Sequence, residues 1–497
     1  MKERDPKGLN RRNFIKLAAA TAGSMAMIGG FNANYAIAKV PKKWNEQADI
    51  IIVGAGGAGL AAAVEATTLG ATAIVLEKMP VIGGSSAICG GALTFAGTDM
   101  QAENNIKDSK ELLYKDFMTV GQNVNVPELV QAYVDNQLET YYWLKRMGIK
   151  FIKVDIASGM SVPRAHYVKP GEVIQILSTK AKASGAKIYT DTSALRLIAD
   201  DTGKIRGVLT ERKGEKLHFG AKKAVILTSG GFSLNKELLS KFVPPMAKAK
   251  VIAGLGSHGD GLKMAWAFGA DIQDMPYIKA TFGFSLDAKT IAHDFALVFY
   301  KGAILVNKEG KRFVNESWSY KLVGDAALVQ TDAMAFQIYD SKIRELSLKD
   351  PLARAESLEK RGVIVSAPTI AELANKIGVP GPALEETVKE YNANVEKGID
   401  PHFGRTTLVA SYGKPVKIEN PPYYAFPSTA AILGTYGGIL TNGKAQVIDI
   451  FKKEIPHLYA AGEIVGGVHG AAYMTGTAFG KALIFGRIAA KNALGKA

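Results

Sequence analysis

The clearest pattern of hydrophobic and polar positions runs from Asp49 to Lys78. An apolar run ends at Val53, glycines follow at 54, 56, 57 and 59, an alanine-rich stretch comes next, and a second apolar run ends at Glu77. Short apolar runs bounded by glycines are typical of buried strands, and the alanine-rich stretch favours a helix. The segment therefore predicts a βαβ unit.

Further along, apolar residues at helical spacing predict helix over Lys110 to Gly148. The runs Lys187–Ile198 and Ile205–Arg212 predict strands, and Ala224–Phe232 reads as a buried strand that ends in glycines. No internal repeat interrupts this α/β pattern.

The character of the chain changes between about Ala270 and Gly434. Aromatic clusters appear there, with predicted helices at Ile370–Ile377 and Ala383–Lys397 and a turn-rich segment at Glu419–Tyr424. The glycine-rich character returns from Leu458 to Gly480. We therefore expect a second domain inserted into the first.

The glycine turn has the spacing of a dinucleotide site. Gly54 permits the tight turn, Gly56 lets the backbone approach a pyrophosphate, and Gly59 lets the helix pack closely on the strand. Glu77 stands where an acid can bind a ribose diol. Glycines also serve plain turns, but strand, helix and terminal acid together favour the nucleotide interpretation.

Composition and charge narrow the class of protein. The 497 residues are 47% hydrophobic and 22% charged, which suits two or three globular domains. The formal net charge is +15, but the lysines are scattered without a basic, aromatic-interleaved motif, so nucleic acid is not an expected partner. Cys89 is the only cysteine, which excludes an intramolecular disulfide, a cysteine metal cluster and a CxxCH haem, and we expect it to be a small buried filler.

The first 38 residues resemble a twin-arginine export signal. Arg11 and Arg12 precede a weakly apolar stretch, and Ala36-Ile37-Ala38 is a small-x-small cleavage pattern. A basic tail and a membrane anchor are the alternatives, but the glycine-broken stretch is too weak to span a bilayer. We expect cleavage after Ala38 and a periplasmic protein, exported folded with its cofactor.

The chain resembles the FAD-dependent flavoproteins of the fumarate reductase and succinate dehydrogenase family, which includes the 3-ketosteroid dehydrogenases. The segments that carry the resemblance are ordered along the chain: GAGGAGLAAA from Gly54, GGSSAICGG from Gly83, TSGGF from Thr228, HGDG from His258, GAILVNKEGKRFVNE from Gly302 and YAAGEIVGGVHGA from Tyr459. The family implies an α/β fold, in which a Rossmann-type FAD-binding domain is interrupted by an α+β capping domain that binds substrate. On this chain we expect the signal at 1–38, the FAD-binding domain at 39–271 and 434–497, and the capping domain at 272–433.

The resemblance also implies which residues hold FAD. The histidine that carries a covalent flavin in succinate dehydrogenases corresponds to Gly84, so non-covalent FAD is expected. The expected FAD-binding residues are Gly54, Gly56, Gly57, Ala58, Gly59, Glu77, Lys78, Gly84, Ser85, Ser86, Gly90, Gly91, Gly230, Asp260, Glu463, Thr477 and Ala478. No metal site is expected.

The substrate positions depart from the dicarboxylate enzymes. Their arginine acid corresponds to Tyr320 and their carboxylate-binding arginine to Tyr473. Their threonine, glutamate and second arginine correspond to Phe295, Ala296 and Phe299, and a histidine corresponds to about Gly434. A dicarboxylate needs paired cationic donors, so fumarate and succinate are not the expected substrates.

The tyrosines instead resemble the ketosteroid dehydrogenase branch, in which Tyr473-Met474-Thr475-Gly476-Thr477 matches a Tyr-x-Ser-Gly-Thr pattern with threonine for serine. We expect Tyr473, tuned by Thr475, to transfer a proton and Tyr320 to polarise the substrate. Packing is the alternative for both tyrosines. Weaker candidates are Tyr436, His166, Tyr167, Arg344 and His293.

These residues predict an enzyme that interconverts CH–CH and C=C bonds next to a carbonyl, with an apolar small-molecule substrate of ketosteroid or enone type. Two alternatives stay open: a respiratory reductase of an unsaturated carboxylate such as an aryl-acrylate, and a flavin electron-transfer protein without substrate chemistry. The expected electron partner is a separate c-type cytochrome or a quinone-linked protein.

Overall fold

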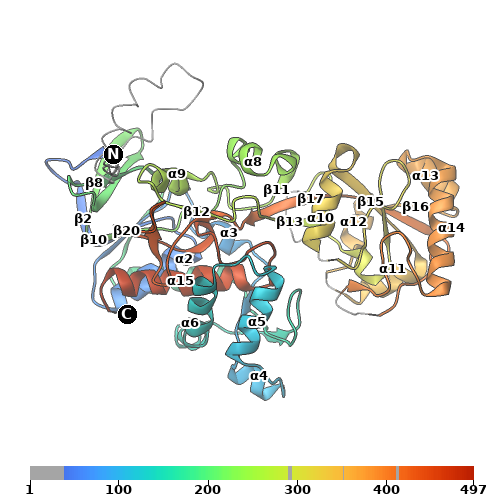
Figure 1. Ribbon diagram of the computed structural model, residues 1–497, viewed down its shortest axis with the longest axis horizontal. Coiled ribbons are helices and arrows are strands. Elements are labelled where there is room, and N and C mark those ends of the chain that lie inside the picture. The colour runs from blue at the N-terminus through green and yellow to red at the C-terminus, as the bar shows by residue number, and fades with distance from the viewer. Residues whose placement is uncertain (1–37, 289–293, 319, 351, 410–412, 497) are drawn as a thin grey trace, which may run out of the picture. The chain divides into compact units, whose positions relative to one another are not determined.

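The computed structural model describes residues 38–288, 294–318, 320–350, 352–409 and 413–496. The expected leader lies outside the described residues apart from Ala38, and so does His293. The chain divides into two compact units, whose elements are labelled in Figure 1. Unit 1 contains the described residues up to Asn235 with Ala253–Tyr277 and Thr435–Ala497, and unit 2 contains Lys236–Ile252 and Ile278–Gly434.

The unit boundaries lie near those expected from the sequence, with one difference. The segment Lys236–Ile252 groups with unit 2 and not with its sequence neighbours. The reason is strand pairing, because β11 (Lys250–Val251) lies parallel to β17 (Tyr423–Thr435).

Unit 1 is built on a mixed sheet centred on the predicted βαβ unit. Strand β2 (Glu46–Val53) pairs in parallel with β3 (Ala73–Leu76) on one side and with the end of β10 (Glu215–Leu227) on the other. Within the described residues, the sheet order is β1 (Ala38–Lys39), β8 (Thr192–Ala199), β9 (Ile205–Arg212), β10, β2, β3 and β7 (Lys187–Tyr189), with β20 (Glu454–Ala460) also beside β10 and β19 (Gln446–Ile448) beside β20. The apolar residues of β2 and β3 are buried, as their unbroken apolar runs predicted.

Helix α2 (Gly57–Thr68) joins β2 to β3, and the C-terminal helix α15 (Thr477–Ala493) packs against it. A Cβ atom at Gly486 of α15 would lie 2.3 Å from the carbonyl oxygen of Ala58, so the two helices meet with backbone in contact. The other helices of unit 1 are α3 (Gly84–Ala87), α4 (Asp99–Glu103), α5 (Lys110–Val120), α6 (Pro127–Arg146), α7 (Pro170–Ala183) and α9 (Asp260–Trp266). Smaller sheets are formed by β4 (Ala92–Thr94), β6 (Ala165–Tyr167) and β5 (Lys153–Asp155), and by β12 (Ile272–Gln273) and β18 (Gly438–Ile439).

Unit 2 is an α+β unit around the long strand β17. Besides β11, its other strands are β13 (Ile278–Ser285), β14 (Ile304–Val306), β15 (Met334–Asp340) and β16 (Val365–Ala367). Its helices include α8 (Lys236–Phe242), α10 (Tyr320–Leu328), α11 (Ser341–Leu348), α12 (Glu356–Lys360), α13 (Ile370–Ile377) and α14 (Gly381–Lys397). The core contains Phe282, Phe299 and Phe426.

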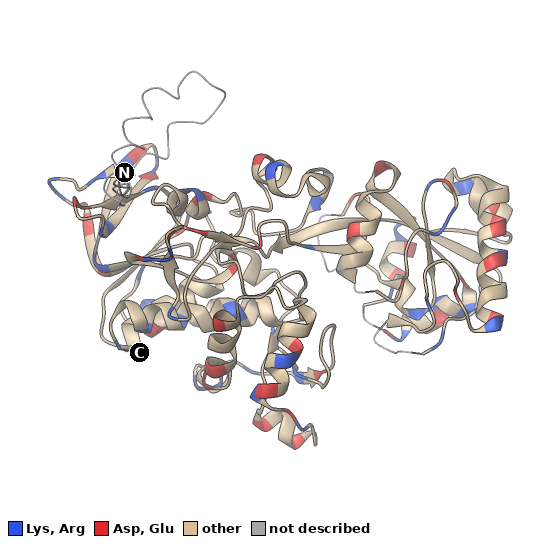
Figure 2. Ribbon diagram, in the orientation of Figure 1, with Lys and Arg blue, Asp and Glu red and all other residues tan. Residues whose placement is uncertain are grey.

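Along the helices of each unit, residues of both charge signs alternate with uncharged residues (Figure 2). This distribution agrees with a solvated surface rather than a single basic stripe. Among the described helices, none is long and apolar enough to cross a membrane.

Candidate active site

The glycines of the β2–α2 turn divide into two kinds. At Gly54, with φ +109°, a Cβ atom would lie 2.4 Å from the carbonyl oxygen of Thr228, and at Gly59 it would lie 1.9 Å from the carbonyl oxygen of Gly54. These two glycines are required by packing. At Gly56 the nearest atom would be 3.8 Å away, so this glycine keeps space open at the start of α2. Open backbone at a helix N-terminus fits a pyrophosphate.

Glu77 directly follows β3, and its carboxylate is bonded to the β2–α2 turn. One oxygen accepts from the backbone N–H of Ala55 at 2.8 Å, and the other accepts from the N–H of Met79 at 2.9 Å. The side chain is buried, and each oxygen has capacity for a further donor. Two anchored acceptors fit a ribose diol, as the sequence predicted.

The serines of the predicted cofactor loop are held by backbone donors. Ser85 Oγ accepts from the N–H of Gly254 at 2.9 Å, and Ser86 Oγ accepts from the N–H of Gly57 at 3.2 Å. Ser86 therefore binds the first turn of α2, and each hydroxyl keeps its own proton to donate. Sequence reasoning did not find this link between the loop and the helix.

The remaining glycines and charges of the predicted set have mixed roles. At Gly84 and Gly90 an added Cβ would have no neighbour within 4 Å, whereas at Gly91 it would lie 2.2 Å from the carbonyl oxygen of Val168. Lys78 donates to Asp260, the first residue of α9, at 2.7 Å. Gly84 and Gly90 thus leave room for a flat group, while Gly91 is needed for packing.

A second polar cluster surrounds Glu463, whose carboxylate accepts from the N–H of Thr435 at 2.9 Å. A Cβ at Gly231 would collide with both Glu463 and Thr435 Oγ1. Among the described residues, the buried hydroxyls of Thr435 and Ser229 have no hydrogen-bond partner. Unpaired buried hydroxyls are costly, and a hydroxyl-rich ligand such as the ribityl chain and phosphates of FAD would satisfy them.

Lys481 of α15 is a buried charge that the sequence analysis missed. Its Nζ donates to the carbonyl oxygen of Val465 at 2.9 Å. Burial lowers the pKa of Lys481 to about 8, while Glu463 and Asp274 act in the opposite direction. The available signal was a lysine flanked by small and apolar residues in the first half of α15.

Tyr473 lies just before α15, and its hydroxyl oxygen accepts from the N–H of Gly476 at 2.9 Å. Burial raises the pKa of Tyr473 above its ordinary value, and hydrogen bonds from the N–H groups of Gly476 and Ala478 oppose the shift. Thr477 Oγ1 donates to the carbonyl oxygen of Met474 at 2.7 Å and so closes the same turn. Tyr473 is therefore a neutral phenol at neutral pH, held at the positive end of a 17-residue helix.

Thr475, expected to tune Tyr473, is fixed through its backbone. Its N–H donates to the carbonyl oxygen of Ser158 at 3.0 Å, and its carbonyl oxygen accepts from Thr94 Oγ1 at 2.6 Å. The direct contact with the Tyr473 hydroxyl comes from the next peptide, at Gly476.

An aromatic cluster adjoins Tyr473. Tyr436 is nearly parallel to it, with ring centroids 6.1 Å apart, and His469 meets Tyr473 edge-on at 5.6 Å. The weak candidate Tyr436 therefore does lie beside Tyr473. Cys89 is half-buried and therefore not the fully buried filler that we expected.

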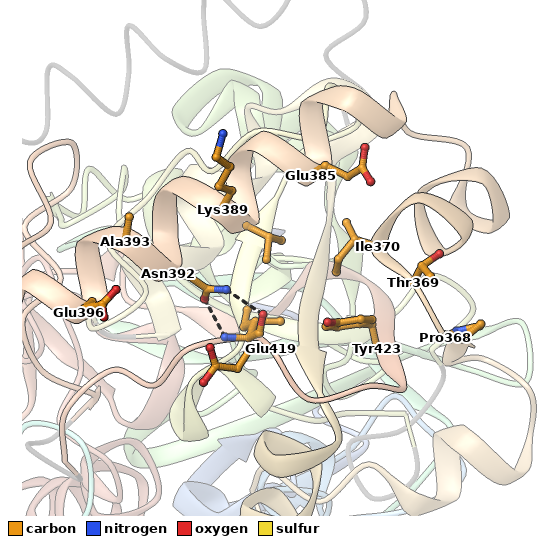
Figure 3. A pocket seen from close by; sticks show the side chains of 12 residues that line it. Pro368, Thr369, Ile370, Glu385, Lys389, Asn392, Ala393, Glu396, Glu419 and Tyr423 are labelled. Carbon is orange, nitrogen blue, oxygen red and sulfur yellow. Dashed lines mark hydrogen bonds between the residues drawn. The ribbon is translucent and has the colours of Figure 1, made fainter.

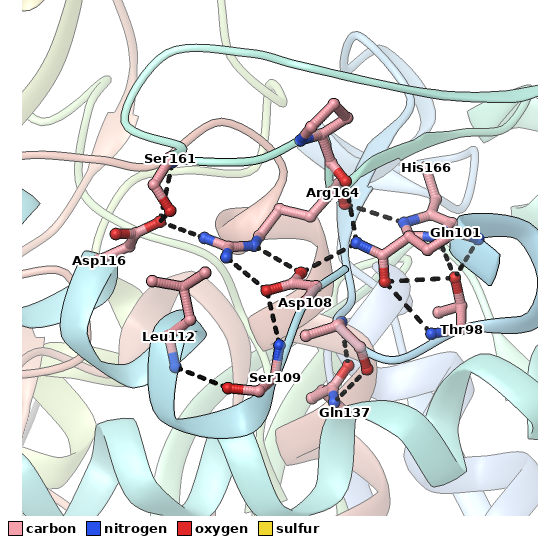
Figure 4. Close-up of polar contacts among 12 residues, drawn as sticks. Thr98, Gln101, Asp108, Ser109, Leu112, Asp116, Gln137, Ser161, Arg164 and His166 are labelled. Atoms are coloured by element: carbon pink, nitrogen blue, oxygen red, sulfur yellow. Dashed lines mark hydrogen bonds and ion pairs between the residues drawn. The ribbon is translucent and has the colours of Figure 1, made fainter. Parts of the chain in front are cut away.

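His166 is fully buried and has both ring nitrogens bonded (Figure 4). Nδ1 is 2.8 Å from the carbonyl oxygen of Arg164, and Nε2 is 2.8 Å from Thr98 Oγ1. Burial lowers the pKa of His166 to about 4. Its neighbour Tyr167 lies under Lys153, with Nζ 5.0 Å from the ring centroid. These contacts favour a structural role for both residues.

In unit 2, Tyr320 is the first residue of α10, is half-buried and packs against the core. Phe295 is also half-buried, but Ala296 and Phe299 are fully buried in that core. The glutamate and the arginine that the resemblance places at these two positions thus correspond to core residues in this chain.

The described arginines of unit 2 are engaged within the unit. They pair as Arg312 with Glu316 and Asp400, Arg344 with Glu359, Arg361 with Asp294, and Arg354 and Arg405 with backbone carbonyls. The candidate Arg344 is thus part of an ion pair.

A surface groove of unit 2 lies between α13, α14 and the segment before β17 (Figure 3). Asn392 lines the groove and links α14 to Ile418. Its side-chain oxygen accepts from the N–H of Ile418 at 2.8 Å, and its side-chain nitrogen donates to the carbonyl oxygen of Ile418 at 2.9 Å. None of the predicted site residues lines this groove.

The βαβ unit, the open glycines and the anchored acid define a dinucleotide-binding protein. The family described as FAD binding domain matches residues 49–478. The chain is 35% identical over 463 residues to a fumarate reductase (cytochrome) of Shewanella frigidimarina, covering 92% of this chain and 78% of that protein. It is 30% identical over 470 residues to urocanate reductase of Eggerthella lenta, with 92% and 76% covered.

Among solved structures, the chain is similar to 3-ketosteroid-Δ4-(5α)-dehydrogenase from Rhodococcus jostii RHA1. The TM-score is 0.75 at 26% identity, covering 92% of this chain and 99% of that one. The chain belongs to the FAD-dependent fumarate reductase and succinate dehydrogenase flavoprotein family. It is an FAD-dependent oxidoreductase acting on CH–CH groups.

Proposed function

We propose that the enzyme interconverts a CH–CH and a C=C bond conjugated to a carbonyl, on a mostly apolar substrate of ketosteroid or enone type. The observation that supports this most is the Tyr473 hydroxyl at the start of α15, bonded to the N–H of Gly476 at 2.9 Å. In the dicarboxylate enzymes that the chain resembles, the position of Tyr473 is occupied by a carboxylate-binding arginine.

In the direction of reduction, Tyr473 donates the proton. The neutral phenol is the acid form at neutral pH, and the N–H groups of Gly476 and Ala478 stabilise the phenolate left behind. When bound in its two-electron-reduced form, FAD would supply the hydride for one carbon of the double bond. The Tyr473 hydroxyl donates the proton to the other carbon, a solvent proton restores the phenol, and the proposed electron partner would return two electrons to the oxidised flavin.

An apolar substrate agrees with the groups at the substrate positions. The described arginines of unit 2 are engaged by acids or carbonyls, and Ala296 and Phe299 replace charged groups. A dicarboxylate bound here would lose its water without gaining paired guanidinium donors. This desolvation costs roughly several kcal/mol for each carboxylate. Fumarate is therefore not the substrate that we propose.

A second candidate is a reductase for an unsaturated carboxylate with an aromatic group. The similarity to urocanate reductase favours it, because urocanate joins a ring to an acrylate. Tyr436 and Tyr473 form nearly parallel rings, which suit a flat aromatic group.

The test is an anaerobic reoxidation assay. Purified enzyme is reduced with dithionite, and flavin absorbance is followed after addition of fumarate, an aryl-acrylate or a steroid enone. Rapid reoxidation by the enone alone supports the proposal, and by the aryl-acrylate alone supports the second candidate. Rapid reoxidation by fumarate contradicts both.

A Tyr473→Phe variant tests the proton donor. We expect kcat to fall by about 10²–10⁴-fold, the usual worth of a general acid, with FAD content unchanged. Tyr459→Phe is a matched control, since its hydroxyl makes one bond to a helix carbonyl at 3.4 Å. If Tyr473→Phe keeps parental turnover, a flavin electron-transfer role without this chemistry is favoured.

We further propose that the enzyme works in the periplasm after twin-arginine export and exchanges electrons with a separate cytochrome or quinone-linked protein. The relative's name, fumarate reductase (cytochrome), supports such a partner, since this chain has one cysteine and no CxxCH motif. Replacing Arg11 and Arg12 by lysine should leave the enzyme in the cytoplasmic fraction. Unchanged export would contradict the proposed route.

A further inference from the structure

The loop of residues 156–163, between β5 and β6, lies against the segment that carries Tyr473. The carbonyl oxygen of Ser158 accepts from the N–H of Thr475 at 3.0 Å. At Gly159, with φ +83°, a Cβ atom would lie 3.2 Å from the Cα of Met474 and 2.9 Å from Val120. The loop is thus in close backbone contact with the residues between Tyr473 and α15.

The loop is anchored to α5 through Asp116 (Figure 4). One carboxylate oxygen of Asp116 accepts both the N–H of Ser161 at 2.9 Å and its Oγ at 2.7 Å. Burial raises the pKa of Asp116, but the bonds from Ser161 and Arg164 outweigh it and hold the pKa below its ordinary value. The anchor is therefore a carboxylate throughout the neutral range.

Arg164 holds the Asp116 carboxylate in place. Its guanidinium is fully buried, bonds Asp108 with distances of 3.0 and 2.6 Å, and pairs with Asp116 through its other terminal nitrogen. A fork held by two carboxylates has a single orientation. The Asp116 carboxylate is consequently rigid, although the loop it holds is partly exposed.

The opposite side of the Tyr473 segment is also tied down. Thr94 Oγ1 donates to the carbonyl oxygen of Thr475, and the carbonyl oxygen of Thr94 accepts from Tyr133. The backbone of Thr475 is therefore hydrogen-bonded twice: its N–H donates to the loop, and its carbonyl oxygen accepts from Thr94 of β4. Tyr473 sits two residues before Thr475, and Gly476, which binds its hydroxyl, sits one residue after it.

We propose that Asp116 is a positioning residue for Tyr473: through Ser161 it fixes the loop of residues 156–163, and the loop fixes the Thr475 peptide and the hydroxyl geometry of Tyr473. This inference rests on the proposed function, because it takes Tyr473 as the proton donor. Misplacement of a proton donor by an ångström costs on the order of 10²-fold in rate. The effect should appear in kcat and not in KM.

The variants are Asp116→Asn, which removes the charge, and Ser161→Ala, which removes only the side-chain bond at an exposed position and so retains the fold. Ser109→Ala is the matched control, because Ser109 caps the same helix through the N–H of Leu112 without touching the loop. Hydrogen exchange is measured for peptides covering 156–163 and 471–477, together with kcat, KM and FAD content.

We expect Asp116→Asn and Ser161→Ala to exchange faster in both peptides and to lose about tenfold or more in kcat, with KM within about threefold and FAD retained. Ser109→Ala should match the parent in all of these. In a Tyr473→Phe background, Asp116→Asn should lower kcat no further.

Unchanged exchange at 471–477, or faster exchange with parental kcat, would overturn the positioning role. If Tyr473→Phe itself has parental kcat, the proposed function and the positioning role fail together. If Tyr473→Phe is inactive while Asp116→Asn and Ser161→Ala keep parental kcat, only the positioning role fails.

Discussion

Individual buried groups in unit 1 are polar where the surrounding sequence is apolar, and their partners explain why they are tolerated. His166 bonds through both ring nitrogens, Arg164 is shared by two carboxylates, and Lys481 reaches a backbone carbonyl. The sequence offered His166 only as a weaker site candidate, whereas its contact with Thr98, 68 residues away in the chain, favours a structural role. No local pattern predicts this contact.

His166 leads to a pH prediction for stability. Its pKa in the folded state is about 4 against an ordinary 6.5, so the unfolded chain binds a proton that the folded chain excludes. The free energy of unfolding should therefore fall as pH drops from about 6.5 to about 4, by up to about 3 kcal/mol from this group. Denaturant unfolding at several pH values measures it.

In a His166→Gln variant, the free energy of unfolding should depend less steeply on pH between about 4 and 6.5, because only the contribution of His166 is removed. At pH 7 to 8, where histidine is neutral in both states, its slope should coincide with that of the parent. An identical slope in parent and variant between pH 4 and 6.5 would contradict the assignment.

At the scale of elements, local patterns succeeded where a segment is autonomous. The βαβ unit, the strand at Ile205–Arg212 and the helix at Ile370–Ile377 were predicted from apolar spacing and are confirmed. The helical stretch predicted over Lys110–Gly148 is two helices, because Gly121 ends α5 and Pro127 begins α6. Between them, the N–H of Val126 donates to the carbonyl oxygen of Gly467, a contact that no local pattern contains.

The strand predicted over Lys187–Ile198 is likewise two strands. Asp191 has φ +49° and its N–H donates to the carbonyl oxygen of Met79. In unit 2, strand β17 pairs with β15, β16 and β11. The most distant of these pairs, Lys250 with Ala431, is 181 residues apart in the chain. Periodicity along the chain does not reveal such non-local pairings, so the sheet of the expected capping domain could not be predicted.

The α2 helix gives the prediction at this scale. Gly59→Ala would place a methyl group 1.9 Å from the carbonyl oxygen of Gly54, forcing the helix away from β2. We expect a loss of about 1–3 kcal/mol in unfolding free energy and loss of bound FAD. Flavin absorbance and thermal unfolding measure both.

Gly171→Ala in α7 is the matched control, because an added Cβ there has no neighbour within 4 Å. It should retain parental FAD content and stability. Full FAD binding by Gly59→Ala would show that α2 can shift without disturbing the nucleotide site.

At the scale of the whole molecule, every residue expected to bind FAD lies in unit 1, while Tyr320 and the aligned substrate positions 295–299 lie in unit 2. The expected cofactor positions and part of the expected substrate positions thus belong to different units. The chain leaves unit 1 twice, at Asn235 and at Tyr277. Each time it returns close to its point of exit. Near the first exit, the N–H of Leu234 donates to the carbonyl oxygen of Ser257 at 2.9 Å, and at the second, the N–H of Tyr436 donates to the carbonyl oxygen of Tyr277 at 3.0 Å.

Because the exits and returns are adjacent, short glycine-serine linkers can replace Lys236–Ile252 and Ile278–Gly434. We expect the shortened chain to bind FAD, since the glycine turn, Glu77 and Glu463 keep their partners within unit 1. We expect no turnover with any substrate, because Tyr320 is gone. The same chain with Gly59→Ala should lose FAD, which separates specific binding from adsorption. A folded shortened chain without FAD would mean that unit 2 supplies part of the cofactor site.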